Sequence, residues 1–166
     1  MQPSKNREEL EFRQFSENFT FYVVEYASVI ENLFNEIILV DLVRDRRNYK
    51  DYLKYYQNQT FNNKKNLVKI IIESNYSNYL DTFSEIFTRI TNVQKWRNDL
   101  AHHSKHYLHD SNQNYTFVLA NSIIGEEICL IKEKMQTLLS EFEKTVSEFR
   151  ELTKIIRKDR RYNLDC

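Results

Sequence analysis

Residues 79–101, YLDTFSEIFTRITNVQKWRNDLA, hold the most regular hydrophobic pattern of the chain. The positions of this pattern are three or four residues apart, and all but one are apolar: Tyr79, Phe83, Ile86, Ile90, Val93 and Leu100. The exception is Arg97, which lies between Val93 and Leu100. This spacing predicts an α-helix from about Tyr79 to Ala101 with one buried face. Arg97 stands where that face calls for an apolar residue. A buried charge is costly unless it is paired, so the misfit makes Arg97 a candidate functional residue.

The sequence before this stretch predicts a long first helix and a short second one. The first helix is expected from about Arg7 to the mid-forties. Its apolar side chains are spaced by three or four residues, at Phe12, Phe15, Phe19, Tyr22, Tyr26, Val29, Leu33 and Ile37. The second helix is expected over about Lys64–Glu73, after a polar loop at Gln57–Asn63. Gly and Pro occur only once each, which favours few, long helices.

After the helix expected at Tyr79–Ala101, called the motif helix below, we expect His103–Asn114 to be a polar connector. A last helix should run from about Thr116 or Val118 to near Arg161. Because each helical residue adds about 1.5 Å, this helix would be longer than a compact domain of this size is wide. Either Gly125 breaks it, or its far end packs on a second copy or on a partner. The sequence therefore predicts an all-α chain that forms a single domain over residues 1–166.

Composition excludes several classes of protein. Hydrophobic residues make up 41% and charged residues 29% of the chain, as is typical of a globular domain. The formal net charge is zero, which argues against a non-specific polyanion binder. The N-terminus is polar and no apolar run reaches membrane length. The two cysteines, Cys129 and Cys166, form no disulfide framework, so we expect a cytoplasmic protein.

Positive charge is concentrated in one segment. Residues 41–70 contain eight basic and three acidic residues. Arg44, Arg46 and Arg47 stand there before a run of tyrosines, which can stack on unpaired RNA bases. The alternative is a continuing helix with a Tyr-rich packing face. These three arginines, together with His103, are the candidate RNA-binding residues.

Arg97, Asn98 and His102 form the candidate catalytic group. Asn98 and His102 are one helical turn apart, and Arg97 borders their face. His suits proton transfer near neutral pH, and Arg suits phosphate. Because no metal-ligand cluster or cofactor motif accompanies them, these residues favour attack of an RNA 2′-hydroxyl on its own phosphate. One His is too few for an acid and a base, whereas a two-fold homodimer supplies two.

Arg97–His102 also resembles the R-x4-H signature of the HEPN superfamily, in the R-N-x-x-A-H form found in bacterial defence and toxin systems. The resemblance implies an antiparallel bundle of four to five helices with long first and last helices. It also implies a homodimeric, metal-independent endoribonuclease in which Arg97 and His102 are catalytic and Asn98 supports them. An antitoxin or regulatory partner is expected, although Ser104 stands where some toxins paired with a nucleotidyltransferase antitoxin carry Tyr. His103 offers an R-x5-H alternative.

Each of these residues also has a structural interpretation. His102 could cap the helix C-terminus. Arg97 could pair with an acidic residue: Asp81, Glu85, Glu25 or Glu31. His106 and His109 are expected to be loop residues, and no zinc site is expected. The alternative function is therefore a non-catalytic helical interaction module.

Overall fold

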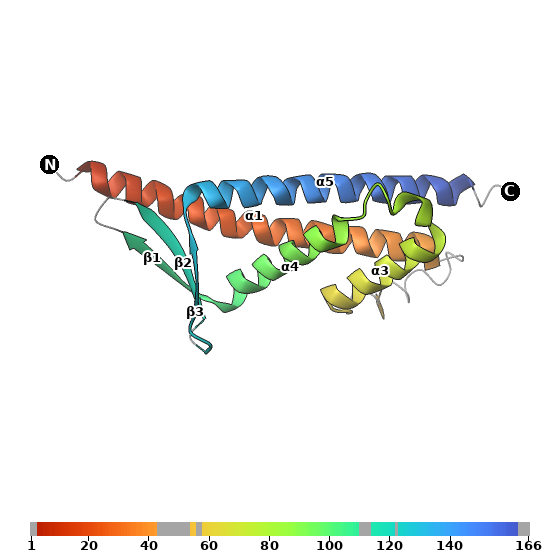
Figure 1. Ribbon diagram of the computed structural model, residues 1–166, viewed down its shortest axis with the longest axis horizontal. Helices are drawn as coiled ribbons and strands as arrows, with labels where there is room; N and C mark the ends of the chain where they lie inside the picture. Colours follow the sequence, from red (N-terminus) through yellow and green to blue (C-terminus); the bar gives the residue numbers. More distant parts are fainter. Residues whose placement is uncertain (1–2, 43–53, 56–57, 110–113, 122, 163–166) are drawn as a thin grey trace. The chain divides into compact units, whose positions relative to one another are not determined.

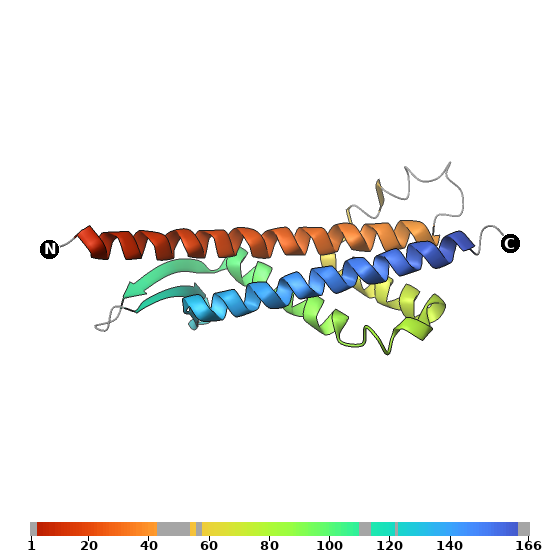
Figure 2. The ribbon, with the colours of Figure 1, turned by 90° about the horizontal axis from the view of Figure 1, so that it is seen from above.

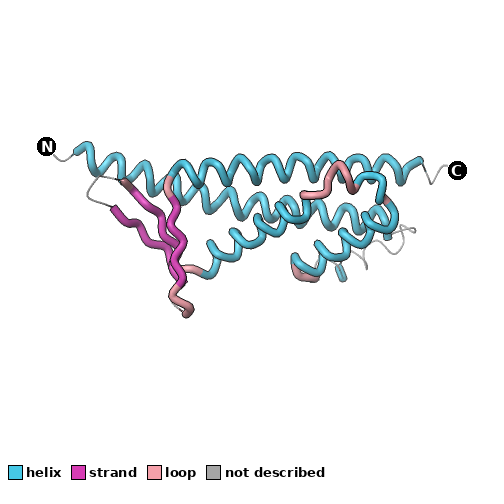
Figure 3. Tube along the Cα trace, viewed as in Figure 1, coloured by secondary structure: helices cyan, strands magenta, loops and turns pink. Residues whose placement is uncertain are grey.

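A computed structural model describes residues 3–42, 54–55, 58–109, 114–121 and 123–162 (Figure 1). Over these residues the protein is mostly helical, with a small sheet (Figure 3). Its α-helices are α1 (Pro3–Leu42), α3 (Phe61–Asn75), α4 (Ile86–His102) and α5 (Lys132–Tyr162), with a 3-10 turn, η2, at Ser77–Tyr79. Its strands are β1 (Ser104–His109), β2 (Tyr115–Asn121) and β3 (Glu126–Leu130). No described helix is long and apolar enough to cross a bilayer.

Helix α1 buries a stripe that coincides only in part with the predicted one: Phe12, Phe19, Leu33 and Ile37 are buried as predicted, whereas Tyr22 is 43% exposed. Phe19, Ile30 and Phe34 are fully buried. Ser16 is buried on the same stripe, and its hydroxyl donates to the Phe12 carbonyl at 2.9 Å. That bond satisfies the hydroxyl within the helix. Phe21 lies on the opposite face and is 64% exposed. The prediction of one long first helix is therefore confirmed over the described residues.

The chain is organised in two compact units. Unit 1 comprises Met1–Tyr26 and Asn92–Glu143, and unit 2 comprises Ala27–Thr91 and Lys144–Cys166. Three helices, α1, α4 and α5, contribute residues to both units. The assignment of residues 1–166 to a single domain stays a prediction.

Unit 1 contains the antiparallel sheet, in the order β1-β2-β3 (Figure 3). Tyr107 of β1 lies opposite Phe117 of β2, which lies opposite Leu130 of β3. Phe12 of α1 covers this face, with its ring edge-on to Tyr107 at 6.5 Å and stacked on Tyr115 at 5.7 Å. The sheet thus buries one face against the first turns of α1.

The strands correct two predictions. The chain is mostly helical, as the all-α class requires, but its three described strands do not fit that class. The last helix begins at Lys132 rather than at Thr116 or Val118. Gly125 provides the break that the sequence allowed, because its φ of 70° suits the left-handed turn between β2 and β3. The Asn121 side chain closes the same turn by accepting a bond from the Ile123 amide at 3.0 Å. The expected connector at His103–Asn114 includes β1.

Unit 2 contains α3 together with parts of α1, α4 and α5, and α3 contacts α1 and α4 (Figure 2). Phe34 packs edge-on against Phe61 at 5.2 Å and against Phe149 at 5.4 Å. Lys64 is buried, with its Nζ 2.7 Å from Glu31. The unit therefore has an aromatic core and an ion pair at its edge.

Polar contacts fix the helix ends of unit 2. Thr60 caps α3 by accepting a bond from the Asn63 amide at 3.2 Å. The Tyr79 hydroxyl donates to Asp159 at 2.6 Å. The motif helix was predicted to begin at Tyr79, but α4 begins at Ile86. The intervening residues form η2 and a turn that still buries Phe83.

Candidate functional site

The candidate residues lie in unit 1, where α4 ends and β1 begins. Helix α4 persists through His102, and β1 starts two residues later at Ser104. Two apolar side chains anchor this helix end. Leu100 is buried, and the Trp96 ring meets the Phe19 ring edge-on at 6.4 Å. The last turn of α4 is therefore held by packing on α1.

Arg97 is exposed, which corrects its expected place on a buried seam. Trp96 contacts Phe19 of α1 and Leu100 is buried at this turn, whereas Arg97, one residue after Trp96, is left uncovered. Arg97 forms no ion pair with any described acidic residue, so the four carboxylates considered above do not neutralise it. Its Nη1 donates to Oδ1 of Asn98 at 3.4 Å. The guanidinium consequently faces solvent beside an amide.

Asn98 and His102 occupy successive turns of one helix face, as the spacing predicts. Asn98 is half-buried and His102 is exposed. The His102 ring makes no hydrogen bond with any described residue. It is the last residue of α4, where a cationic side chain is favoured. The ring is accessible to a ligand and can also fulfil that electrostatic role.

His103 is held more firmly than His102. Its amide donates to the Asp99 carbonyl at 3.0 Å, and its ring Nδ1 lies 2.9 Å from the same oxygen. A carbonyl oxygen only accepts hydrogen bonds, so Nδ1 carries the proton of this bond. In the neutral ring, the lone pair therefore lies on Nε2. His103 therefore has a fixed orientation, whereas His102 is free to turn toward a ligand. Both histidines stay candidates for the catalytic imidazole.

The carboxylate of Asp99 is a feature of this helix end that the motif spacing does not indicate. Its carboxylate oxygen Oδ2 is buried and has no hydrogen-bond partner among the described residues. Asp99 and His103 are four residues apart, a spacing that places them on one face of the helix. In the sequence, this four-residue spacing is the signal that links Asp99 to His103.

The other predicted residues are three arginines and two histidines. Arg44, Arg46 and Arg47 fall outside the described residues. His106 and His109 are on β1 rather than in a loop, and the His109 ring lies 4.9 Å from that of Tyr115. Among the described residues, no group of three or more His, Cys, Asp or Glu side chains is arranged to hold a metal ion.

The end of α4 thus combines an exposed guanidinium, an amide and two imidazoles within seven residues. This set can bind a phosphate and transfer protons. Comparison with protein-family models finds no match, and neither a curated protein nor a solved structure matches the chain.

Proposed function

We propose that the protein is a metal-independent endoribonuclease of the HEPN type. The observation that supports this most is the exposure of both Arg97 and His102 at an anchored helix end, where no acidic side chain of the described part of the chain pairs with the guanidinium. A solvent-facing guanidinium on the same helix end as an exposed imidazole suits a phosphodiester.

In the proposed reaction, a histidine base removes the proton from an RNA 2′-hydroxyl, and that oxygen attacks the neighbouring phosphorus. Arg97 stabilises the charge that develops on the phosphoryl oxygens. A second imidazole gives a proton to the departing 5′-oxygen as its bond to phosphorus breaks. The products are a 2′,3′-cyclic phosphate and a 5′-hydroxyl, and no metal takes part.

Two imidazoles are supplied by two copies in this proposal. A two-fold homodimer places the same surface of each chain face to face, so that two Arg97 and two His102 side chains share one cleft. Asn98 supports the guanidinium through the bond between their side chains. In the cell, such a nuclease would act as a toxin or defence effector restrained by an antitoxin or another regulatory protein.

The test is cleavage of total RNA in EDTA by wild type, Arg97→Ala, His102→Ala and His103→Ala. The matched control is His106→Ala, which alters an exposed histidine on β1 outside the motif. We expect the Arg97 variant and one histidine variant to lose about 100- to 10,000-fold in rate. Loss with His103→Ala instead of His102→Ala would identify the second imidazole as the catalytic one. Equal cleavage by all variants, or cleavage that requires added metal, would exclude the mechanism.

A second function, a non-catalytic interaction module, is favoured by exposed apolar side chains on α1. Phe21 and Val24 are 64% and 46% exposed on the face opposite the buried stripe. Exposed apolar surface of this kind marks a protein contact when it is continuous. This function predicts no RNA cleavage, together with binding to a partner that is lost in Phe21→Glu and kept in Arg97→Ala.

A further inference from the structure

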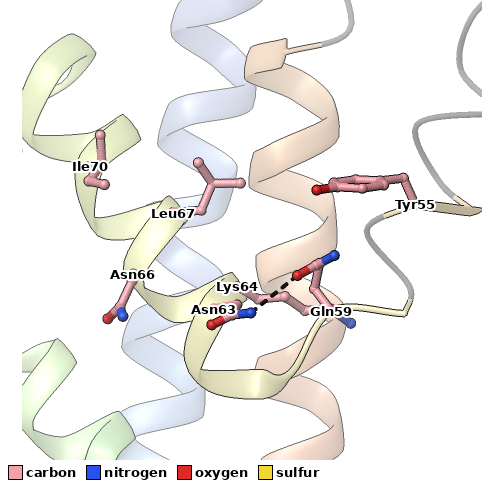
Figure 4. A pocket seen from close by; sticks show the side chains of 7 residues that line it. All are labelled: Tyr55, Gln59, Asn63, Lys64, Asn66, Leu67 and Ile70. Atoms are coloured by element: carbon pink, nitrogen blue, oxygen red, sulfur yellow. Dashed lines mark hydrogen bonds between the residues drawn. The ribbon is translucent and has the colours of Figure 1, made fainter.

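Unit 2 contains a pocket that the proposed reaction does not use. It has a volume of about 380 Å³ and lies between Tyr55 and the first three turns of α3 (Figure 4). Tyr55 and Leu67 point toward one another across it, and Ile70 lies beyond Leu67. Pockets that bind small organic groups have volumes of about 300–1,000 Å³. This one is at the small end of that range.

Side-chain amides form the polar wall of the pocket. Asn63 Nδ2 donates to Gln59 Oε1 at 3.2 Å, as the dashed line in Figure 4 marks. This bond fixes the two amides side by side and turns the Asn63 oxygen and the Gln59 nitrogen to other partners. Asn66 adds a third amide to the lining. The wall therefore offers adjacent donors and acceptors without a net charge.

The remaining walls suit a flat, apolar face. Tyr55 is 63% exposed and Ile70 is 58% exposed. Aromatic side chains exposed at the mouth of a pocket can stack on unpaired bases. Among the described residues that line the pocket there is no carboxylate, and the charge of Lys64 is matched by Glu31 at 2.7 Å. The pocket thus suits an uncharged planar group with hydrogen-bonding edges.

A pocket of unit 1 has a different chemistry. It measures about 600 Å³, and its charged lining residues are Glu8, Glu11, Glu133 and Lys132. Three carboxylates against one ammonium group leave this lining negative, so it would repel the phosphates of a nucleic acid. The contrast makes the unit 2 pocket the better candidate for a ligand that is attached to phosphate.

We propose that the unit 2 pocket binds an unpaired nucleobase, with Tyr55 stacked on the base and the amides of Gln59 and Asn63 bonded to its edge. That the base belongs to RNA rests on the proposed function, since a free nucleotide offers the same chemistry. Every base has a donor and an acceptor close together on its edge, and an amide can present either one. We therefore expect only modest preference among the four bases.

The test measures binding, so it does not depend on cleavage. The probe is a fluorescein-labelled RNA pentanucleotide whose 2′-O-methyl groups prevent attack on the phosphates, and its binding is followed by fluorescence anisotropy. An abasic strand of equal length carries the same phosphates without bases. We expect the abasic strand to bind at least 5-fold more weakly. Adenosine monophosphate, used as a competitor, distinguishes a free nucleotide from a strand as the better ligand.

The variant Tyr55→Leu should weaken binding of the pentanucleotide about 5- to 100-fold, the usual effect of losing one stacking ring. Tyr55→Phe keeps the ring and should bind within about 3-fold of wild type. Tyr22→Leu removes a partly exposed tyrosine of unit 1 and is the matched control. Equal binding of the abasic strand, or equal effects of Tyr55→Leu and Tyr22→Leu, would overturn the proposal. Tyr55-dependent binding by a chain that does not cleave RNA would uphold the pocket and contradict the proposed function alone.

Discussion

The contact between Phe19 and Trp96 predicts how firmly the end of α4 that carries the candidate site is held. Phe19 is fully buried, and its ring lies edge-on to Trp96 at a centroid distance of 6.4 Å. Phe19→Ala should therefore lower the free energy of unfolding by about 3–5 kcal/mol, through lost burial and the cavity left behind. About 0.5–1.5 kcal/mol of this loss belongs to the aromatic pair.

Trp96 reports this change directly, because it is the only tryptophan of the chain. Urea unfolding followed by tryptophan fluorescence gives the stability, and circular dichroism checks that the whole chain unfolds together. The folded Phe19→Ala protein should also emit at longer wavelength than wild type, since removing the Phe19 ring opens the indole to water.

The matched control is Phe21→Ala, two residues along the same helix. Phe21 is 64% exposed, so its loss should cost no more than about 0.5 kcal/mol. Equal destabilisation by the two variants, or unchanged emission in Phe19→Ala, would refute the argument that Phe19 anchors the end of α4.

Two further predictions concern a turn and a helix end. Gly125→Ala should lower the free energy of unfolding by about 1–2 kcal/mol, measured by urea unfolding, because φ is 70° at this position. Nothing lies within 4 Å of the added methyl group, so backbone strain alone is measured. A stability equal to wild type would contradict the left-handed turn. The hydrogen bond from Tyr79 to Asp159 raises the pKa of Tyr79 above 10.0, so the stability it contributes is present below pH 10.0 and is lost as pH rises through the folded-state pKa. Thermal unfolding of wild type and Tyr79→Phe between pH 7 and 11 should show a difference that shrinks in alkali, and a constant difference would contradict it.

The helices could be predicted from the sequence where hydrophobic spacing alone determines them. Phe12, Phe19 and Ile37 of α1 are buried as the three-and-four spacing requires, although Tyr22 of the same series is 43% exposed. Ile86, Ile90 and Val93 in α4 are buried in the same way. These contacts repeat within a few turns of one helix, so local sequence is sufficient to indicate them.

The strands could not be predicted in the same way. Ile128, Ile131 and Met135 are three and four residues apart and extend the α5 pattern backward, although the helix begins only at Lys132. The pairing of Phe117 with Leu130 joins residues 13 positions apart and depends on the turn at Gly125. A short apolar run fits a helix or a strand until its partner is known.

The residues of the candidate site could be predicted from the sequence, but the exposure of Arg97 could not. The continuation of α4 through His102 places Asn98 and His102 on one face, as expected. Periodicity gives the direction of Arg97 around the helix, but not whether a neighbouring element covers that direction. The ring bond of His103 was also out of reach, because it depends on how the chain leaves α4.

The central claim is a metal-independent site shared by two copies, and mixing subunits tests it most directly. Wild-type chains are mixed in equal amount with the double variant Arg97→Ala/His102→Ala, exchanged by refolding together, and assayed on RNA in EDTA. If two copies form one cleft, only wild-type pairs cut, and random pairing leaves about one quarter of the activity of the same total amount of wild type. A remaining activity of about one half would show that each chain acts alone, and no cleavage by wild type itself would contradict the claim altogether.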